Sequence, residues 1–203
     1  MAGMSRFDEK APDWDTPERE DRAREVAAII KEQVPLTSEM RLIDIGAGTG
    51  LLGLELAGAV GSVVLAEPSE GMLEVARRKL ADGGLANVSA IPFDLQDSPA
   101  DVGPFDLAVS LLVLHHVEDT TAALRSIHDL LALGGRIALL DLDAEDGTFH
   151  DDPEGIHHHG FDRAALVRLA GEAGFRDAEA RIVSEIERDG RMYPVFLLTG
   201  RRS

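Results

Sequence analysis

The 203-residue sequence contains no cysteine, one tryptophan and one tyrosine, and only 20 basic residues against 37 acidic ones. Without cysteine, the chain can form no disulfide, no thiolate metal site and no cysteine nucleophile. The net charge of -17 repels phosphate backbones and anionic lipids, so we expect neither nucleic acid nor a membrane as partner. No apolar run reaches the roughly 18 to 20 residues of a membrane-spanning helix, and the N-terminus is too acidic for a secretory signal. These absences predict a cytoplasmic protein.

Strand and helix patterns alternate along the chain after an N-terminal arm (1–15) without clear periodicity. A helix begins at Pro17 and stops before Pro35. The expected strands are 41–45, 62–66, 87–91, 105–110, 136–142, 178–187 and 192–200, and the expected later helices are 50–59, 69–80, 120–133 and 162–173. Asp189-Gly190 is a hairpin signal between the last two strands. The order predicts one α/β domain (1–203), with an arm and helix at 1–35 and a core at 36–203.

A glycine-rich turn follows the first expected strand in the segment LIDIGAGTG, Leu42 to Gly50. Its glycines allow positive φ and let a ligand approach the backbone closely. The next helix offers free N–H groups and the positive end of its dipole. Glu67 follows the second strand, where a carboxylate can accept both hydroxyls of a ribose. The segment therefore indicates a nucleotide cofactor.

Two cofactor classes compete for this turn. A dinucleotide fold expects G-x-G-x-x-G directly after the strand, and counted from Gly46 that pattern fails at Leu51. Counted from Gly48 the pattern fits, but its first glycine then lies two residues beyond the strand. Asp44 discriminates better, because a carboxylate beside the turn repels a pyrophosphate and attracts an ammonium or sulfonium group. The sequence favours a cationic cofactor, and an NAD(P)-dependent Rossmann-fold oxidoreductase is the alternative.

Five segments in order resemble the motifs of class I S-adenosylmethionine-dependent methyltransferases. The first is LIDIGAGTG, and the later ones are AEPSEGML (66–73), IPFDLQD (91–97), FDLAVSLLVLHHVED (105–119) and LLALGGRIAL (130–139). The resemblance covers roughly residues 40–200 and departs at Leu133, where many relatives have lysine or proline. It implies a Rossmann-like, seven-stranded, mostly parallel sheet with a C-terminal antiparallel hairpin and helices on both faces.

The resemblance also implies S-adenosyl-L-methionine as cofactor, S-adenosyl-L-homocysteine as product, and a set of contacts. Residues of the glycine turn would hold the methionine part and the ribose, Glu67 would take the ribose hydroxyls, and Asp94 would accept from the adenine amine. Trp14 would line the pocket from the arm. The implied cofactor residues are Trp14, Asp44, Gly46, Ala47, Gly48, Gly50, Glu67, Pro68, Met72, Phe93, Asp94, Leu95, Ser110 and Leu111.

Histidines gather after the fourth and fifth expected strands. Methyl transfer needs a base only if the acceptor must lose a proton, and the family has no universal catalytic residue. His115 and His116 follow the fourth strand, Asp141 and Asp143 end the fifth, and the loop at 143–160 carries four further histidines. The candidates selected for a substrate pocket or base are His116, His150 and His158. Two alternatives are a loop-stapling role and a metal site of His150, Asp151 and His157 to His159, and no metal is predicted.

The resulting hypothesis is a methyltransferase acting on oxygen or nitrogen of a small molecule. A chain of 203 residues has no room for a large substrate-binding cap, so we expect a small acceptor covered by the arm and the histidine loop. An inactive methyltransferase-like binding module is a further alternative. The sequence does not identify the acceptor, and it leaves open whether the protein is a monomer or a homodimer.

Overall fold

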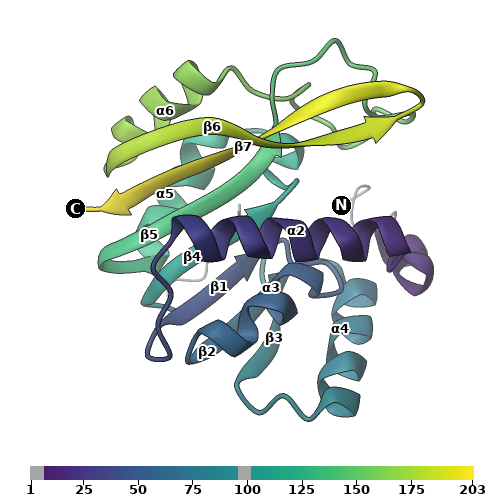
Figure 1. The fold of residues 1–203 in the computed structure, drawn as a ribbon, viewed down its shortest axis with the longest axis vertical. Coiled ribbons are helices and arrows are strands. Elements are labelled where there is room, and N and C mark those ends of the chain that lie inside the picture. The colour runs from purple at the N-terminus through teal and green to yellow at the C-terminus, as the bar shows by residue number, and fades with distance from the viewer. Residues whose placement is uncertain (1–6, 96–101) are drawn as a thin grey trace.

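The computed structural model describes residues 7–95 and 102–203, whose centre is a seven-stranded sheet of order β3-β2-β1-β4-β5-β7-β6 (Figure 1). Neighbouring strands from β3 to β5 pair in parallel, and β7 is antiparallel to both β5 and β6. The bounds are β1 Arg41–Ile45, β2 Ser62–Glu67, β3 Val88–Pro92, β4 Phe105–Leu111, β5 Leu131–Leu142, β6 Phe175–Arg188 and β7 Arg191–Arg202. The predicted fold class is confirmed.

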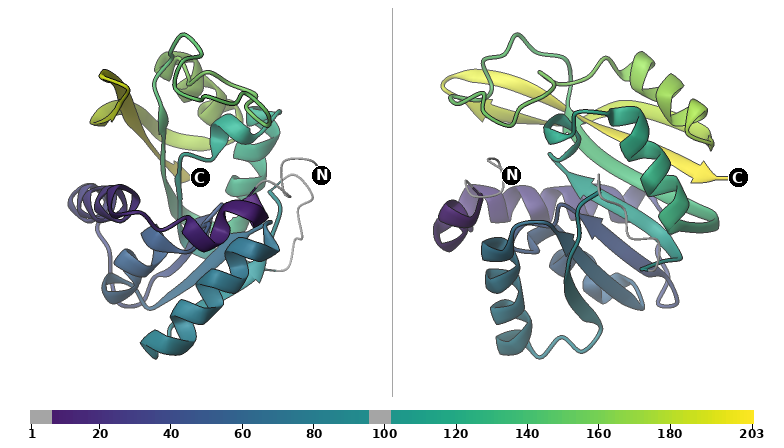
Figure 2. Two further views of the ribbon diagram at one scale, coloured as in Figure 1. Left: turned by 90° about the vertical axis from the view of Figure 1, so that its right-hand side faces the viewer. Right: turned by 180° about the vertical axis from the view of Figure 1, so that it is seen from behind.

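Helices cover both faces of the sheet (Figure 2). Successive strand residues point to opposite faces, so Leu42 belongs to the buried cluster that includes α2 and α3, while Ile43 belongs to the one that includes α5 and α6. This double burial explains why the parallel strands are almost uniformly apolar. The helical bounds are η1 Ala11–Asp13, α2 Pro17–Gln33, α3 Leu51–Leu56, η2 Ala57–Ala59, α4 Glu70–Gly83, η3 Leu114–His116, α5 Thr120–Leu130 and α6 Arg163–Glu172.

The expected end of the helix predicted at 120–133 is wrong by three residues. We expected the helix to reach residue 133 before the paired glycines, but α5 ends at Leu130 and β5 begins at Leu131. Leu131 is buried and pairs with Phe105, whereas Leu133 is 80% exposed. Burying Leu131 against a strand far away in sequence therefore outweighs one more turn of helix.

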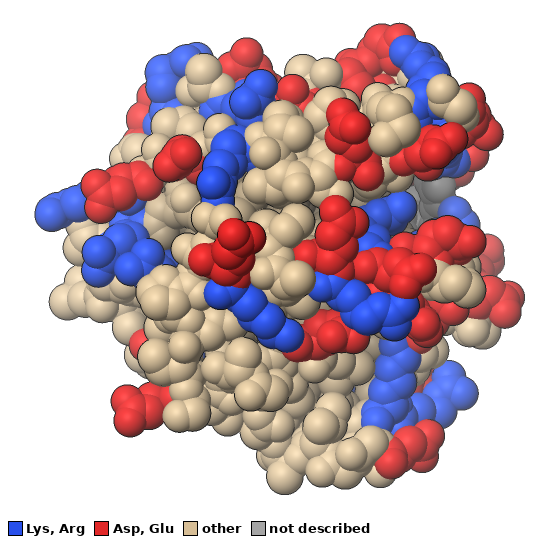
Figure 3. Space-filling view, viewed as in Figure 1, with Lys and Arg blue, Asp and Glu red and all other residues tan. Residues whose placement is uncertain are grey.

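Charged side chains of both signs are interspersed over the face seen in Figure 3, and acidic ones gather where α2 begins. Glu18 and Glu20 lie in the first turn of α2, where the helix dipole favours negative charge. Within the described ranges, no helix has both the length and the apolarity that crossing a bilayer would require.

Replacing Gly53 with alanine is expected to lower the free energy of unfolding by about 2 kcal/mol, because the core has no space for the added methyl group. A Cβ at Gly53 would lie 2.4 Å from Leu65 Cδ2 and 3.0 Å from Asp44 Oδ2. Gly58→Ala is the matched control, since nothing lies within 4 Å of a Cβ there. Urea unfolding of both variants tests the prediction, which fails if the two are equally stable.

Candidate functional site

The site is built at the edge of the sheet where the strand order reverses. β1 lies between β2 and β4, and ligands of such sheets bind beyond the carboxyl ends of the strands at this point. The glycine turn follows β1, Glu67 ends β2, and Leu111 ends β4. Segments far apart in sequence therefore meet at one edge, as the predicted cofactor site requires.

The glycine turn is tightly packed. Gly46, Gly48 and Gly50 have φ of 64°, 55° and 87°, values that side chains rarely adopt. The N–H groups of Gly46 and Ala47 both donate to the carbonyl of Ala66, at 2.8 and 3.2 Å. A Cβ at Gly46 would lie 2.6 Å from Val113 Cγ2. The turn therefore needs glycine for its backbone shape, and at Gly46 also for packing.

The Glu67 carboxylate is held in place by backbone donors. Its Oε2 accepts from the N–H of Gly48 at 2.8 Å, and its Oε1 accepts from the N–H of Ser69 at 2.9 Å. Burial raises the pKa of Glu67, the two N–H groups oppose the shift, and the neighbouring Asp8 and Asp94 add to it. A carboxylate has about four lone-pair positions, so positions remain for two more donors. This geometry fits the two hydroxyls of a ribose.

Asp44 is a buried carboxylate with no cationic partner among residues 7–95 and 102–203. It is 2% exposed, and its Oδ2 accepts from the N–H of Gly53 at 2.8 Å. The pKa of Asp44 is raised to about 7, mainly because the group is buried; the Gly53 N–H opposes the rise and the charge of Glu67 contributes to it. Keeping an unpaired negative charge out of water is costly. The residue therefore suits a ligand that brings a positive charge.

The N-terminal arm closes over the glycine turn. Asp15 Oδ1 accepts from Thr49 Oγ1 at 2.5 Å, and Lys79 Nζ lies 2.5 Å from Asp15 Oδ2. Asp8 Oδ1 accepts from Ser69 Oγ at 2.5 Å and thereby ties the arm to the start of α4. Trp14 Nε1 lies 3.5 Å from the position that a Cβ of Gly48 would take. The structure thus places Trp14 directly against the turn.

The other predicted cofactor residues differ in exposure. Met72, Phe93 and Leu95 are buried, and Pro68 is exposed. Asp94 is partly exposed and close enough to Glu67 to affect its pKa. Ser110 is buried, and its Oγ has no hydrogen-bond partner among the described residues. Gln96 and Asp97, the last residues of the third motif segment, lie outside the described residues.

Two of the three selected histidines hold the loop at 143–160 in place. His158 Nε2 lies 2.9 Å from the carbonyl oxygen of Val117 and 3.1 Å from Thr120 Oγ1. His116 Nδ1 lies 2.8 Å from the carbonyl oxygen of Gly155. Within the described part of the chain, no group of three or more side chains could hold a metal ion. The contacts of His116 and His158 therefore fit the alternative in which these histidines fasten the loop to the rest of the domain.

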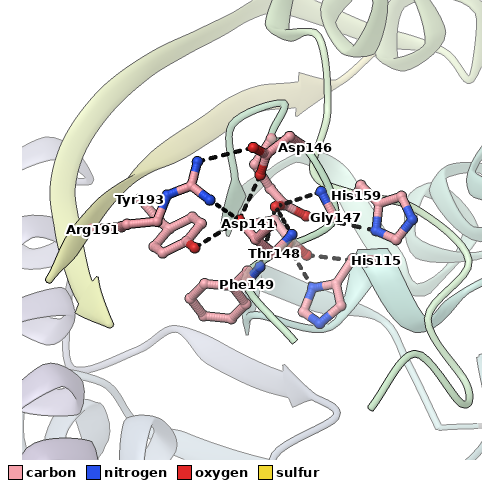
Figure 4. A network of polar contacts seen from close by, with 10 residues as sticks. His115, Asp141, Asp146, Gly147, Thr148, Phe149, His159, Arg191 and Tyr193 are labelled. Atoms are coloured by element: carbon pink, nitrogen blue, oxygen red, sulfur yellow. Dashed lines mark hydrogen bonds and ion pairs between the residues drawn. The ribbon is translucent and has the colours of Figure 1, made fainter. Parts of the chain in front are cut away.

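His115, which the selection left out, forms a buried pair with Asp141 (Figure 4). His115 Nδ1 lies 2.7 Å from Asp141 Oδ1, and this carboxylate also accepts from the backbone N–H groups of His115 and Leu142. His115 is 1% exposed, and its Nε2 has no partner among the residues described. The pairing of Leu111 with Leu140 places the ends of β4 and β5 side by side, and this register is the signal that could have found the pair.

His150 lies beside His115 in an apolar setting. The ring centroids of the two histidines are 4.9 Å apart, and the Phe149 ring lies 4.8 Å from that of His150. The pKa of His150 is lowered to about 4, mainly by burial and in smaller part by the nearby His115, His116 and Arg188, while Glu145 opposes the shift. His150 Nε2 is buried and unpartnered within the described ranges. His150 is therefore a neutral imidazole at neutral pH.

His150→Gln is expected to make the protein less sensitive to acid. The folded pKa of about 4 lies below the ordinary value of 6.5, so the unfolded chain binds the proton more tightly. Wild-type protein therefore loses stability as the pH falls from about 6.5 to 4, and the variant lacks this loss. Over this pH range, we expect the free energy of unfolding to decrease more in the wild type than in the variant, by on the order of 1 kcal/mol.

Urea unfolding at pH 6.5 and pH 4.5 measures this difference. His157→Gln, at an exposed position of the same loop, is the control and is expected to behave as wild type. Equal acid sensitivity of wild type and His150→Gln would contradict the prediction.

Comparisons with known proteins agree with this geometry. A family model described as a methyltransferase domain matches residues 19–180. The ubiquinone/menaquinone biosynthesis C-methyltransferase UbiE of Idiomarina loihiensis is 39% identical over 106 residues, which are 50% of this chain and 42% of that protein. The chain thus spans less than half the length of this curated relative.

Solved structures share the fold. A SAM-dependent methyltransferase from Aquifex aeolicus has a TM-score of 0.72 and 18% identity, with 97% of this chain and 98% of that chain covered. A Haemonchus contortus phosphoethanolamine N-methyltransferase 2, in complex with phosphomonomethylethanolamine and S-adenosylhomocysteine, has a TM-score of 0.74 and 17% identity, with 87% and 52% covered. At such identities the likeness is one of fold.

Proposed function

The chain belongs to the methyltransferase-domain family and has the class I fold, and we propose that it transfers a methyl group from S-adenosylmethionine to a small molecule. One observation carries the choice of cofactor. Asp44 is a buried carboxylate without a cationic partner among the described residues, and it lies two residues before Gly46, where the glycine turn begins. When bound, the cofactor supplies a methyl group on a sulfonium, which is already activated for displacement.

The chain's own residues divide the binding between them. Asp44 attracts the positive charges of the methionine part, and Glu67 accepts from the ribose hydroxyls with the lone pairs that Gly48 and Ser69 leave. Asp94 accepts from the adenine amine. Trp14 and the arm exclude water from above the turn. The protein thus contributes alignment and a dry pocket to the reaction.

The predicted acceptor atoms, oxygen or nitrogen, stay a prediction. The curated relative is named a C-methyltransferase, and the Haemonchus enzyme is an N-methyltransferase. The fold therefore serves acceptors of several kinds, and the acceptor must be inferred from the residues beside the cofactor. The cytoplasmic location and the absence of nucleic-acid and membrane partners also stay predictions.

Calorimetric titration with S-adenosylmethionine, S-adenosylhomocysteine and NAD tests the proposal. We expect both adenosyl compounds to bind and NAD to give no heat of binding, because its pyrophosphate would lie near the buried carboxylate of Asp44. Tight binding of NAD without binding of S-adenosylhomocysteine would overturn the proposal in favour of an oxidoreductase. Binding without methyl transfer to any acceptor would favour the inactive binding module.

A further inference from the structure

Two imidazole nitrogens beyond the ends of β4 and β5 are buried and lack partners. They are Nε2 of His115 and Nε2 of His150, neither of which meets a hydrogen-bonding atom of the described chain. Buried polar atoms in proteins are nearly always satisfied, so two orphans side by side indicate a missing partner. The ring centroids are 4.9 Å apart, which is close enough for one small ligand to meet both.

We propose that His115, positioned by Asp141, is the general base for an acceptor with a phenolic or enolic hydroxyl group. The inference rests on the proposed methyltransferase function and names the substrate class of the same site. It selects His115, which the sequence placed after the fourth strand but which was not among the three selected histidines, and it gives Asp141 the role of a positioning residue.

The hydrogen bonds of Asp141 determine which nitrogen of His115 can accept a proton. The backbone N–H groups of His115 and Leu142 both donate to the Asp141 carboxylate, at 3.2 and 2.8 Å. A carboxylate only accepts, so His115 Nδ1, 2.7 Å away, carries the hydrogen. His115 Nε2 then carries the free lone pair. When it is protonated, the imidazolium is stabilised by the adjacent carboxylate, as in other histidine–aspartate pairs.

The proton transfer balances as follows. The O–H bond of the acceptor breaks and its proton goes to His115 Nε2. The electron pair left on the acceptor forms the bond to the methyl carbon, directly at oxygen or at the conjugated carbon. The carbon–sulfur bond breaks, its electrons stay on the sulfur, and the sulfonium charge is lost. Methylation at carbon first gives a keto product, and in a phenol the hydrogen of the methylated carbon then moves to the oxygen by tautomerisation. One proton therefore leaves in total in either case, and His115 returns it to water.

Aromatic rings around these histidines favour a flat acceptor. Phe149 lies edge-on to His150, with centroids 4.8 Å apart, and Phe7 of the arm lies edge-on to His116 at 5.4 Å. Phe7 also lies 5.8 Å from Trp14, so the ring cluster reaches the residue that covers the glycine turn. A planar acceptor placed among these rings would face both the cofactor site and His115.

Charge and acidity restrict the acceptor further. The net charge of -17 disfavours an anionic substrate, so the acceptor enters neutral and loses its proton inside. A base is needed only if the nucleophilic group carries a proton, and an imidazole is best matched to a weak acid such as a phenol or an enol. His150 is neutral and can donate a hydrogen bond to the acceptor oxygen. The two orphan nitrogens thus have complementary roles.

The test uses three probes with the full chain and S-adenosylmethionine. 4-Nitrophenol has a phenolic hydroxyl, 1,3-cyclohexanedione has an enolic one, and pyridine can be methylated without losing a proton. Mass spectrometry detects the products, and NMR distinguishes methyl on oxygen from methyl on carbon for the dione. We expect methylation of at least one acidic probe and a faster reaction than with pyridine. Methylation of pyridine alone, or of none of the probes, would overturn the assigned substrate class.

Variants separate the base from the cofactor site. We expect His115→Gln to lower kcat at least 100-fold for the acidic probe while the Kd for S-adenosylhomocysteine stays within twofold of wild type. His157→Gln, at an exposed position of the loop, should retain wild-type kcat. A His115→Gln variant that keeps half of the wild-type kcat would overturn the role of His115. If the wild-type protein does not bind S-adenosylhomocysteine, the proposed function itself is overturned.

A spectroscopic measurement keeps the inference testable if His115→Gln does not fold. In the wild-type complex with S-adenosylhomocysteine, 4-nitrophenol should bind as the yellow phenolate at a pH below the pKa of the free probe. Asp141→Asn keeps His115 but removes its carboxylate partner, so the bound probe should lose its yellow colour at that pH. A bound probe that is neutral in the wild-type complex, or no binding of the probe, would contradict the inference.

Discussion

Asp44→Asn is expected to weaken the binding of S-adenosylmethionine about 100-fold, or by about 2.7 kcal/mol, and to stabilise the cofactor-free protein at pH 8. The loss of affinity follows because an amide does not attract the ammonium and sulfonium groups of the cofactor as a buried carboxylate does. The gain in stability follows because Asp44 carries an unpaired charge in a position that is 2% exposed. Isothermal titration and urea unfolding measure the two effects.

The stabilisation should depend on pH. The pKa of Asp44 is about 7 in the folded protein and 3.8 in the unfolded chain, so the folded chain holds the proton more tightly. Wild-type protein is therefore fully stabilised by this group below about pH 4, and loses that stability as the pH rises through 7. Asp44→Asn has no such loss, so we expect it to be more stable than wild type by on the order of 2 kcal/mol at pH 8 and similar to it at pH 4.

Asp82→Asn provides the matched control, because Asp82 lies on α4 and is exposed. It should leave both the affinity and the stability unchanged. An Asp44→Asn variant that binds S-adenosylmethionine as wild type does would show that Asp44 does not attract the cofactor's charge. If Asp44→Asn is less stable than wild type at pH 8, burying the charged carboxylate of Asp44 costs less free energy than burying an asparagine amide at this position.

The fold was predictable because its signals are local. The parallel strands are apolar runs and the helices have caps and glycine ends, so each element can be located from its own residues. The end of α5 was missed because it depends on a partner elsewhere. Leu131 pairs with Phe105, and this contact across 26 positions leaves no mark in the helical pattern around Leu131.

The candidate site divides in the same way. The placement of Asp44, Glu67 and Asp94 at one edge could be predicted because a parallel sheet gathers the ends of its strands. The choice among the histidines could not be predicted. His115 and His116 are adjacent in sequence, and only the register of β4 on β5 sets His115 against Asp141. The docking of the arm through Asp15 and Thr49 likewise depends on contacts between distant residues.

Glu67→Ala is expected to weaken the binding of S-adenosylhomocysteine by about 2 kcal/mol or more, because it leaves the buried ribose hydroxyls without an acceptor. Isothermal titration measures this loss. Glu70→Ala is the matched control, since Glu70 lies three residues further on and its side chain is 69% exposed. An unchanged affinity of Glu67→Ala would show that this carboxylate is not the ribose ligand.

Adenosine separates the roles of Glu67 and Asp44. It has the ribose but lacks the charged methionine part, so its affinity should fall in Glu67→Ala and stay near that of wild type in Asp44→Asn. The opposite pattern would exchange the two roles. A loss of adenosine binding in both variants would mean that the two carboxylates act as one unit. Such coupling has a physical basis, because the charge of Glu67 raises the pKa of Asp44. The two carboxylates are also joined through the backbone, since Glu67 accepts from the N–H of Gly48 in the turn and Asp44 accepts from the N–H of Gly53 in the helix that follows it.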